Sequence, residues 1–175
     1  DALAVASYAA QNKVPILLTK PNSMPGNVEN FVKGAKKTYV IGGTQAVSQD
    51  VEKRLTNLER IAGNSRYDTA LEIITKFYKN TPHLYVSTGS NFADALTGSV
   101  LAAKNNTAIL LVEKEKIVGD VNFLLNRNQV ETFQVFGGAA AVSDTVVNAM
   151  LNSVLSVNET TIGAAEASSY LIKAT

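Results

Sequence analysis

Residues 84–112 read LYVSTGSNFADALTGSVLAAKNNTAILLV, and this stretch decides the fold. An apolar run ends in a turn of Gly, Ser and Asn, a helical stretch rich in small residues follows, and a second apolar run closes the segment. Short continuous apolar strands that alternate with helices are typical of a parallel sheet covered on both faces. The sequence therefore predicts an α/β fold with a parallel sheet flanked by helices.

The sequence on either side continues this alternation. Apolar residues at helical spacing predict an amphipathic helix over 65–78, in which Ser65 is the N-cap and Asp68 completes an approximate capping box. The other predicted elements are strands at 58–63, 84–88, 107–112 and 132–138, and helices near 93–104, 118–125 and 144–151.

The chain contains an internal repeat. Residues 1–18 match 94–111 at nine of eighteen positions, and 39–48 match 134–143 at six of ten. The first copy begins inside its unit but keeps every later element, so we expect the chain to be part of a longer protein. We also expect the segment after Asn152 to fold back onto the sheet of the first copy. The predicted division is a first copy at 1–57, a second copy at 58–152, and a degenerate start of a further copy or a terminal helix at 153–175.

Composition narrows the class of protein. Of the 175 residues, 46% are hydrophobic, which is enough for a buried core, and the apolar runs are too short for a membrane span. Cysteine is absent, which excludes disulfides and thiolate metal sites. Residues 1–79 carry 11 Lys and Arg against 7 Asp and Glu, so an anionic partner would prefer this half. The excess is too small to indicate nucleic acid, and we expect neither nucleic acid nor a membrane as a partner.

Four ordered motifs resemble the cell wall binding repeat type 2 family: RIAGNSRYDTA (60–70), STGSNFADAL (87–96), AILLV (108–112) and VFGGAAAVS (135–143). The resemblance implies a small Toprim-like or Rossmann-like α/β sandwich that occurs as tandem repeats packed into a pseudo-trimer. It also implies a non-catalytic module that holds a secreted surface protein on the cell wall of Gram-positive bacteria. Such modules bind an anionic secondary wall polymer non-covalently, which would be a cell-wall polysaccharide or a teichoic-acid-like polymer.

Arg66 and Arg60 are the most informative charged residues. Arg66 lies at the start of a predicted helix, where the helix dipole disfavours a cation, so an anion should pair with it. Two interpretations stay open: an internal carboxylate such as Asp94 or Glu59, or a phosphate or carboxylate of the polymer. The same two interpretations apply to Arg60.

Other candidates for polymer contact are Asn91 and Phe92, because they follow a strand end of the kind where α/β sheets bind ligands. Phe92 could stack on a sugar ring or fill the core beneath its loop. A basic cluster, which could equally be a solvated surface, is formed by Lys33, Lys36 and Lys37.

A second set of residues is expected to shape turns and helix ends. Glycine pairs close two strands, with turn geometry or contact with an anion as the alternatives. Serines that follow these turns are expected to cap helices, and an aspartate is expected to cap a helix or pair with an arginine. These residues are Gly42, Gly43, Gly137, Gly138, Ser48, Ser143 and Asp94.

No catalytic pattern is present. His83 is the only histidine, and no H-E-x-x-H, D-x-D or G-x-S-x-G motif occurs, so we expect no metal, no other cofactor and no enzymatic activity. Two alternatives to polymer anchoring remain. One is an assembly module that packs against other copies of the repeat and has no ligand site of its own. The other is the targeting domain of an N-acetylmuramoyl-L-alanine amidase-type autolysin.

Overall fold

A computed structural model describes residues 1–159 of the chain. In chain order its elements are α1 (Ala2–Gln11), α2 (Gly26–Val32), β1 (Thr38–Ile41), α3 (Gln49–Glu52), β2 (Leu58–Ile61), α4 (Arg66–Phe77), β3 (His83–Thr88), α5 (Phe92–Lys104), β4 (Ile109–Val112), α6 (Val121–Arg127), β5 (Thr132–Phe136) and α7 (Asp144–Glu159).

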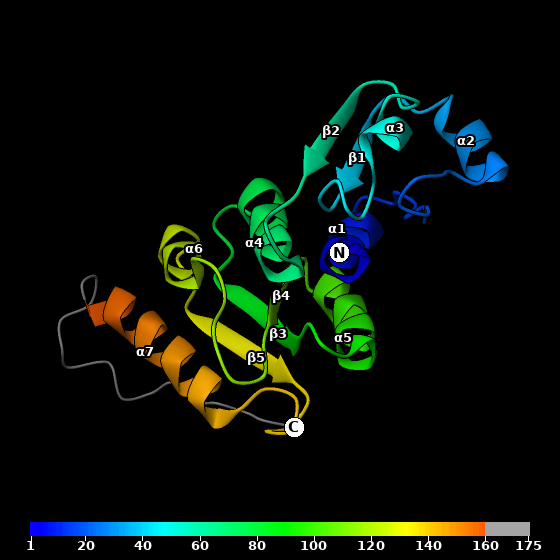
Figure 1. The fold of residues 1–175 in the computed structure, drawn as a ribbon. Helices are drawn as coiled ribbons and strands as arrows, with labels where there is room; N and C mark the ends of the chain where they lie inside the picture. Colours follow the sequence, from blue (N-terminus) through cyan, green and yellow to red (C-terminus); the bar gives the residue numbers. More distant parts are fainter. Residues whose placement is uncertain (160–175) are drawn as a thin grey trace.

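The larger sheet is parallel, with the strand order β4-β3-β5. In the central strand, Tyr85 pairs with Ile109 of β4 on one side and with Gln134 of β5 on the other. Helix α5 connects β3 to β4 and helix α6 connects β4 to β5, so each parallel connection crosses over through a helix (Figure 1). The predicted α/β fold with a parallel sheet flanked by helices is confirmed.

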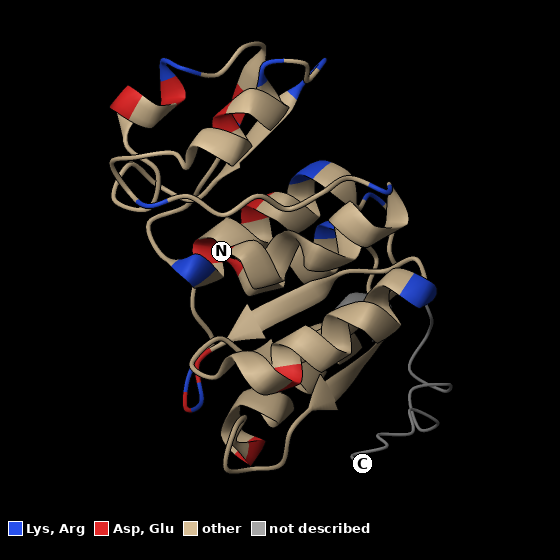
Figure 2. Ribbon diagram, turned by 90° about the vertical axis from the view of Figure 1, so that its right-hand side faces the viewer, with Lys and Arg blue, Asp and Glu red and all other residues tan. Residues whose placement is uncertain are grey.

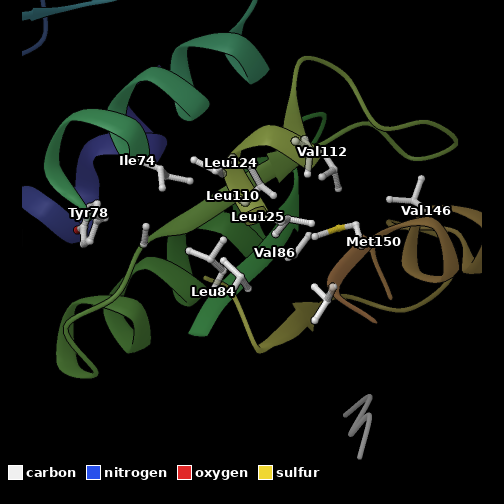
Figure 3. Packing of buried hydrophobic residues seen from close by; sticks show 14 of the residues in the cluster. Ile74, Tyr78, Leu84, Val86, Leu110, Val112, Leu124, Leu125, Val146 and Met150 are labelled. Atoms are coloured by element: carbon white, nitrogen blue, oxygen red, sulfur yellow. The ribbon is translucent and has the colours of Figure 1, made fainter. Parts of the chain in front are cut away.

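Both faces of this sheet are covered. Successive side chains of a strand point to opposite faces of the sheet. The continuously apolar strands therefore contribute side chains to two cores, one on each face. One face packs against α6, α7 and one side of α4 (Figure 3), and the other packs against α1, α5 and the other side of α4. The first core contains Leu84, Val86, Leu110, Val112, Leu124, Leu125, Val146 and Met150. The second contains Ala4, Val5, Ala70, Ile73, Tyr85, Ala95, Ala102, Ile109 and Leu111.

Polar side chains fix several helix starts. The Ser65 hydroxyl accepts a hydrogen bond from the Asp68 amide at 3.2 Å and donates to the Asp68 carboxylate at 2.9 Å. In a full capping box the Asp68 carboxylate would accept from the backbone amide of Ser65. Here the carboxylate accepts from the Ser65 hydroxyl instead. The Asp120 carboxylate accepts from the Phe123 amide at 3.0 Å, and this cap begins α6 at Val121, later than predicted.

The first copy forms a smaller lobe. Strands β1 and β2 pair in parallel, and α2 and α3 lie beside them (Figure 1). A small core of Met24, Val32 and Val51 lies between these helices and the adjoining loop. Strand β2 lies at the start of the predicted second copy. The pairing therefore joins residues 38–41 of the first copy to residues 58–61 of the second.

Residues 14–18 differ from the prediction. In the second copy the equivalents of residues 16–19 form β4, but here no strand forms, and Leu18 and Ile16 are 71% and 42% exposed. Strand β4 receives its hydrogen bonds from β3, whereas no strand of the described structure pairs with residues 16–19. Because a strand requires a neighbour for its backbone groups, the expectation that the first copy keeps every later element is wrong at this strand.

Helix α1 joins the first copy to the second. The Gln11 side chain donates to the carbonyls of Ala102 and Thr107 at 3.3 and 3.0 Å. The Tyr78 hydroxyl, at the end of α4, donates to the Ser7 hydroxyl at 3.2 Å. The two copies therefore share one core rather than folding side by side.

The last described helix is longer than predicted. Helix α7 continues from Asp144 to Glu159, so residues 153–159 extend it. The rest of the segment that we expect to fold back lies outside the described residues.

Candidate functional site

The carboxyl ends of the parallel strands bring several predicted site residues together. Strand β3 ends at Thr88 and leads through Gly89 and Ser90 into Asn91, the N-cap of α5. Arg66, the first residue of α4, reaches this turn and donates from Nη1 to the Gly89 carbonyl oxygen at 2.8 Å. We call Arg66, Asn91 and Phe92 the strand-end group.

Arg66 has no carboxylate partner among residues 1–159. Neither Asp94 nor Glu59, the two expected internal partners, forms an ion pair with it, and Glu59 pairs instead with Lys37 and Lys76. The residue is exposed, and its one printed bond within the described chain is to a neutral carbonyl. Figure 2 shows a basic segment beside the N-terminus.

Asn91 and Phe92 are both exposed beside Arg66. The Asn91 side-chain oxygen accepts from the Ala93 amide at 3.2 Å and so caps α5. The Phe92 ring does not fill the core, because the residue is 69% exposed. The interpretation of Phe92 as a core residue is therefore wrong.

Arg60 is in a different environment, because its side chain turns back into the first copy. Its Nε donates to the Glu52 carboxylate at 2.9 Å and its Nη2 donates to the Val47 carbonyl at 2.7 Å. Its Nη1 donates to the Gly42 carbonyl. With only 19% of the side chain exposed, Arg60 holds the turn that follows β1 and lacks the free face of Arg66.

The glycine turns are built alike in the two copies. Gly42 and Gly137 follow β1 and β5 with φ of 109° and 92°, which favours glycine. In each copy the aspartate that begins Asp-Ala-Leu lies against this glycine: a Cβ on Gly137 would be 2.8 Å from Asp94 Oδ2, and a Cβ on Gly42 would be closer still to Asp1 Oδ2. The sequence analysis missed this contact, although the repeat contains both residues in both copies.

The second glycine of each pair and the following serine complete the turn. The Gly43 carbonyl accepts from the amides of Ala46 and Val47. The Gly138 carbonyl accepts from the equivalent amides of Ala141 and Val142. The Ser48 hydroxyl accepts from the Val51 amide at 3.5 Å, whereas the buried Ser143 hydroxyl has no hydrogen-bond partner within the described residues. The predicted cap by the Ser143 side chain is thus not formed, although its carbonyl accepts from the first turn of α7.

The lysine cluster lies at the opposite end of the smaller sheet. Lys33 follows α2, and Lys36 and Lys37 precede β1, at the amino end of this strand, whereas Arg66 follows the carboxyl end of β2. Lys33 and Lys36 are exposed, and Lys37 pairs with Glu59 at 2.9 Å. The structure therefore separates the predicted polymer contacts into two groups.

The one histidine lies outside both groups. His83 begins β3 with its Nδ1 2.7 Å from the Thr132 hydroxyl, and burial lowers the pKa of its ring. Within the described part of the chain, no group of three or more His, Cys, Asp or Glu side chains could hold a metal ion.

Comparison with known proteins relates this geometry to a family. A family model described as Cell wall binding domain 2 (CWB2) matches residues 1–52 and 60–147. The chain belongs to this family. The resemblance carried by the four motifs is confirmed, and the strand-end group lies within the matched residues.

Two curated relatives come from Bacillus subtilis (strain 168). The CWB2 chain is 34% identical over 157 residues to N-acetylmuramoyl-L-alanine amidase LytC, covering 89% of this chain and 32% of that protein. It is 29% identical over 153 residues to Amidase enhancer, covering 86% of this chain and 21% of that protein. The chain thus spans about a third of the first relative and less of the second.

A solved structure supports the same family. Cwp8 from Clostridium difficile matches with a TM-score of 0.74 and 28% identity, covering 90% of this chain and 27% of that chain. The CWB2 chain is therefore a binding module of proteins found at the cell wall or cell surface. Among residues 1–159, no helix is long and apolar enough to cross a membrane.

Proposed function

We propose that this CWB2 chain anchors a larger surface protein by binding an anionic secondary wall polymer, through Arg66 with Asn91 and Phe92 beside it. One observation carries the proposal: Arg66 is an exposed cation at a helix start, without a carboxylate partner among the described residues. The α4 N-terminus adds partial positive charge at the same point, so a phosphate or carboxylate would meet both. The exposed Phe92 ring offers an apolar surface to an adjoining sugar.

The chain is proposed to act as the wall-targeting part of a protein whose activity lies elsewhere. LytC is an amidase by name, and the match covers only 32% of it. This supports an autolysin-type enzyme as one attached effector, and we expect the chain itself to be non-catalytic and to need no cofactor.

Arg66→Ala should weaken binding to intact Gram-positive walls roughly tenfold, because a charge-assisted contact to the polymer is lost. The measurement is co-sedimentation with purified walls, before and after extraction of their anionic polymer, at low and high salt. Wild-type binding should fall on extraction and in high salt.

The matched control is Arg127→Ala. Arg127 is another exposed arginine, in the last turn of α6, and α6 leads to the amino end of β5, away from the strand-end group. Equal binding by both variants and the wild type would contradict the role of Arg66, and no wall binding by the folded chain would contradict the proposed function.

A second candidate function is assembly with other copies of the repeat, and an exposed apolar stripe on α5 favours it. Phe92, Leu96 and Val100 lie four residues apart and are 69%, 51% and 70% exposed. In the repeat, Leu3 and Ser7 of α1 are equivalent to Leu96 and Val100 of α5. Unlike their α5 counterparts, both are covered: Leu3 packs against the core shared with α5, and Ser7 is 0% exposed. We propose that the stripe receives the equivalent helix of another copy, as in a pseudo-trimer.

Leu96→Glu should therefore reduce self-association of the chain, which sedimentation velocity can measure over a range of concentrations. A charge introduced into an apolar contact disfavours burial. Phe123→Glu on α6 is the matched control, because Phe123 is also exposed, at 58%, but lies outside the stripe. Equal association of both variants would contradict the use of the stripe.

A further inference from the structure

An aromatic and lysine cluster lies where α1, β1, β2 and α4 meet. Tyr8 stacks on Phe77 with ring centroids 3.7 Å apart, and Tyr39 meets Phe77 edge-on at 5.1 Å. All three residues are only partly buried, so ring surface remains accessible. With Lys37, Lys76 and Glu59, which contact these rings or each other, they form what we call the Tyr39 cluster.

This cluster is distinct from the strand-end group. Arg66 is the first residue of α4 and Phe77 the last. A helix of this length rises about 16 Å from end to end. A ligand group held at Arg66 therefore cannot touch the Phe77 ring, and the two surfaces need separate explanations.

Two lysines place positive charge at the rings. Lys37 Nζ lies 4.8 Å from the centroid of Tyr39, and Lys76 Nζ lies 5.9 Å from that of Phe77. Both ammonium groups pair with the Glu59 carboxylate, Lys37 at 2.9 Å. Hydrogen bonds from Lys76 and then Lys37 lower the pKa of Glu59, and the hydrogen bond to Glu59 is the largest cause that raises the pKa of Lys37. Two ammonium groups share one carboxylate, which leaves an excess positive charge, and the exposed Lys36 lies next in sequence.

Comparison of the two copies shows that the repeat fold does not require this cluster. At the positions of Tyr8, Tyr39 and Lys37, the second copy carries Leu101, Gln134 and Thr132. The second copy forms β5 and α5 with these residues. The second copy thus forms the same elements without these two rings and this lysine, although in the first copy Tyr8 and Tyr39 also pack against the core.

The chemistry of the cluster selects a class of ligand. The face of an aromatic ring packs on the C–H face of a sugar ring, because both surfaces leave water and the π electrons attract the polarised hydrogens. Lysines beside the rings can pair with a carboxylate or phosphate on the same sugar. We infer that the Tyr39 cluster is a second subsite, which binds a negatively charged sugar residue of the wall polymer. This inference rests on the proposed function and adds a subsite to it.

The second copy supplies substitutions that the fold tolerates for the test. Tyr39→Gln and Lys37→Thr should each weaken binding of purified anionic wall polysaccharide roughly three- to tenfold, as measured by calorimetric titration. Tyr39→Phe keeps the ring and should bind like the wild type. Lys36→Thr is the matched control, an exposed lysine with no ring contact in the described structure, and should change the affinity less. Thermal unfolding of each variant checks the fold.

Two further ligands separate charge from sugar. Polyphosphate, which has charge but no sugar ring, should lose affinity with Lys37→Thr but not with Tyr39→Gln. Neutral dextran should bind none of the proteins measurably.

The outcomes distinguish the inference from the proposed function. If Tyr39→Gln and Lys37→Thr both bind the polysaccharide as the wild type does, while Arg66→Ala binds it more weakly, the second subsite is overturned. Polymer anchoring through Arg66 then stands. Absence of binding by the wild-type chain would overturn both. If Tyr39→Gln fails to fold, Lys37→Thr decides alone, because it changes a side chain that is 46% exposed.

Discussion

Replacing Arg60 with alanine should lower the free energy of unfolding by about 2–4 kcal/mol. The substitution removes three hydrogen bonds, to the Glu52 carboxylate and to the Gly42 and Val47 carbonyls. It also leaves Glu52, whose side chain is only 20% exposed, without its cation. Thermal or urea unfolding of the two proteins measures the difference.

Arg54→Ala is the matched control for this prediction. Arg54 also pairs with a carboxylate, that of Glu29, but its side chain is 42% exposed. An ion pair on the surface is screened by water and contributes little to stability, so this variant should unfold close to the wild type. Polymer affinity of the folded Arg60→Ala protein should be unchanged. Normal stability with lost wall binding would place Arg60 in the polymer site instead.

Leu110→Ala should be the most destabilising aliphatic truncation, at about 3 kcal/mol. Leu110 lies in the edge strand β4 of the larger sheet, is 0% exposed, and packs in the core beneath α6 and α7 (Figure 3). Its removal leaves a cavity that strands on a rigid sheet cannot close. For a chain of this size the melting temperature should fall by roughly 6–12 °C.

Leu96→Ala makes the same chemical change at a position that is 51% exposed. It should cost less than about 0.5 kcal/mol, because little apolar surface returns to water and no cavity forms. Differential scanning calorimetry of both variants at low protein concentration, where self-association is negligible, gives the comparison. Similar losses in both variants would contradict the prediction that burial of Leu110 sets the cost.

The sequence predicted the second copy well because its signals are local. Continuous apolar strands, the Ser65 cap and the helical spacing of 65–78 each act within a few residues, and all appear in the structure. The repeat would place a strand at 16–18 of the first copy, and it does not form for a non-local reason. Its residues match those of β4, but a strand forms only where another strand supplies hydrogen bonds.

The candidate site shows the same limit. Arg60 and Arg66 belong to one motif, and their spacing does not reveal that one side chain turns into the first copy while the other reaches Gly89. Ser48 and Ser143 end identical Ala-Val-Ser triplets, yet only the Ser48 hydroxyl accepts from a helix amide in the described structure. Side-chain direction depends on neighbours from distant parts of the chain, and those neighbours come only with the fold.

The packing of α1 on α5 has a direction. The two helices are equivalent by sequence, yet Ser7 of α1 is buried and its counterpart Val100 of α5 is 70% exposed. They therefore meet through different faces, as in a head-to-tail contact, whereas a two-fold contact would use the same face twice. A head-to-tail contact uses one face on each copy and leaves two unlike faces unused until a ring closes. In the assembly proposed above, copies would add in one sense only, and a substitution in the α5 stripe would block the next copy while leaving α1 in place.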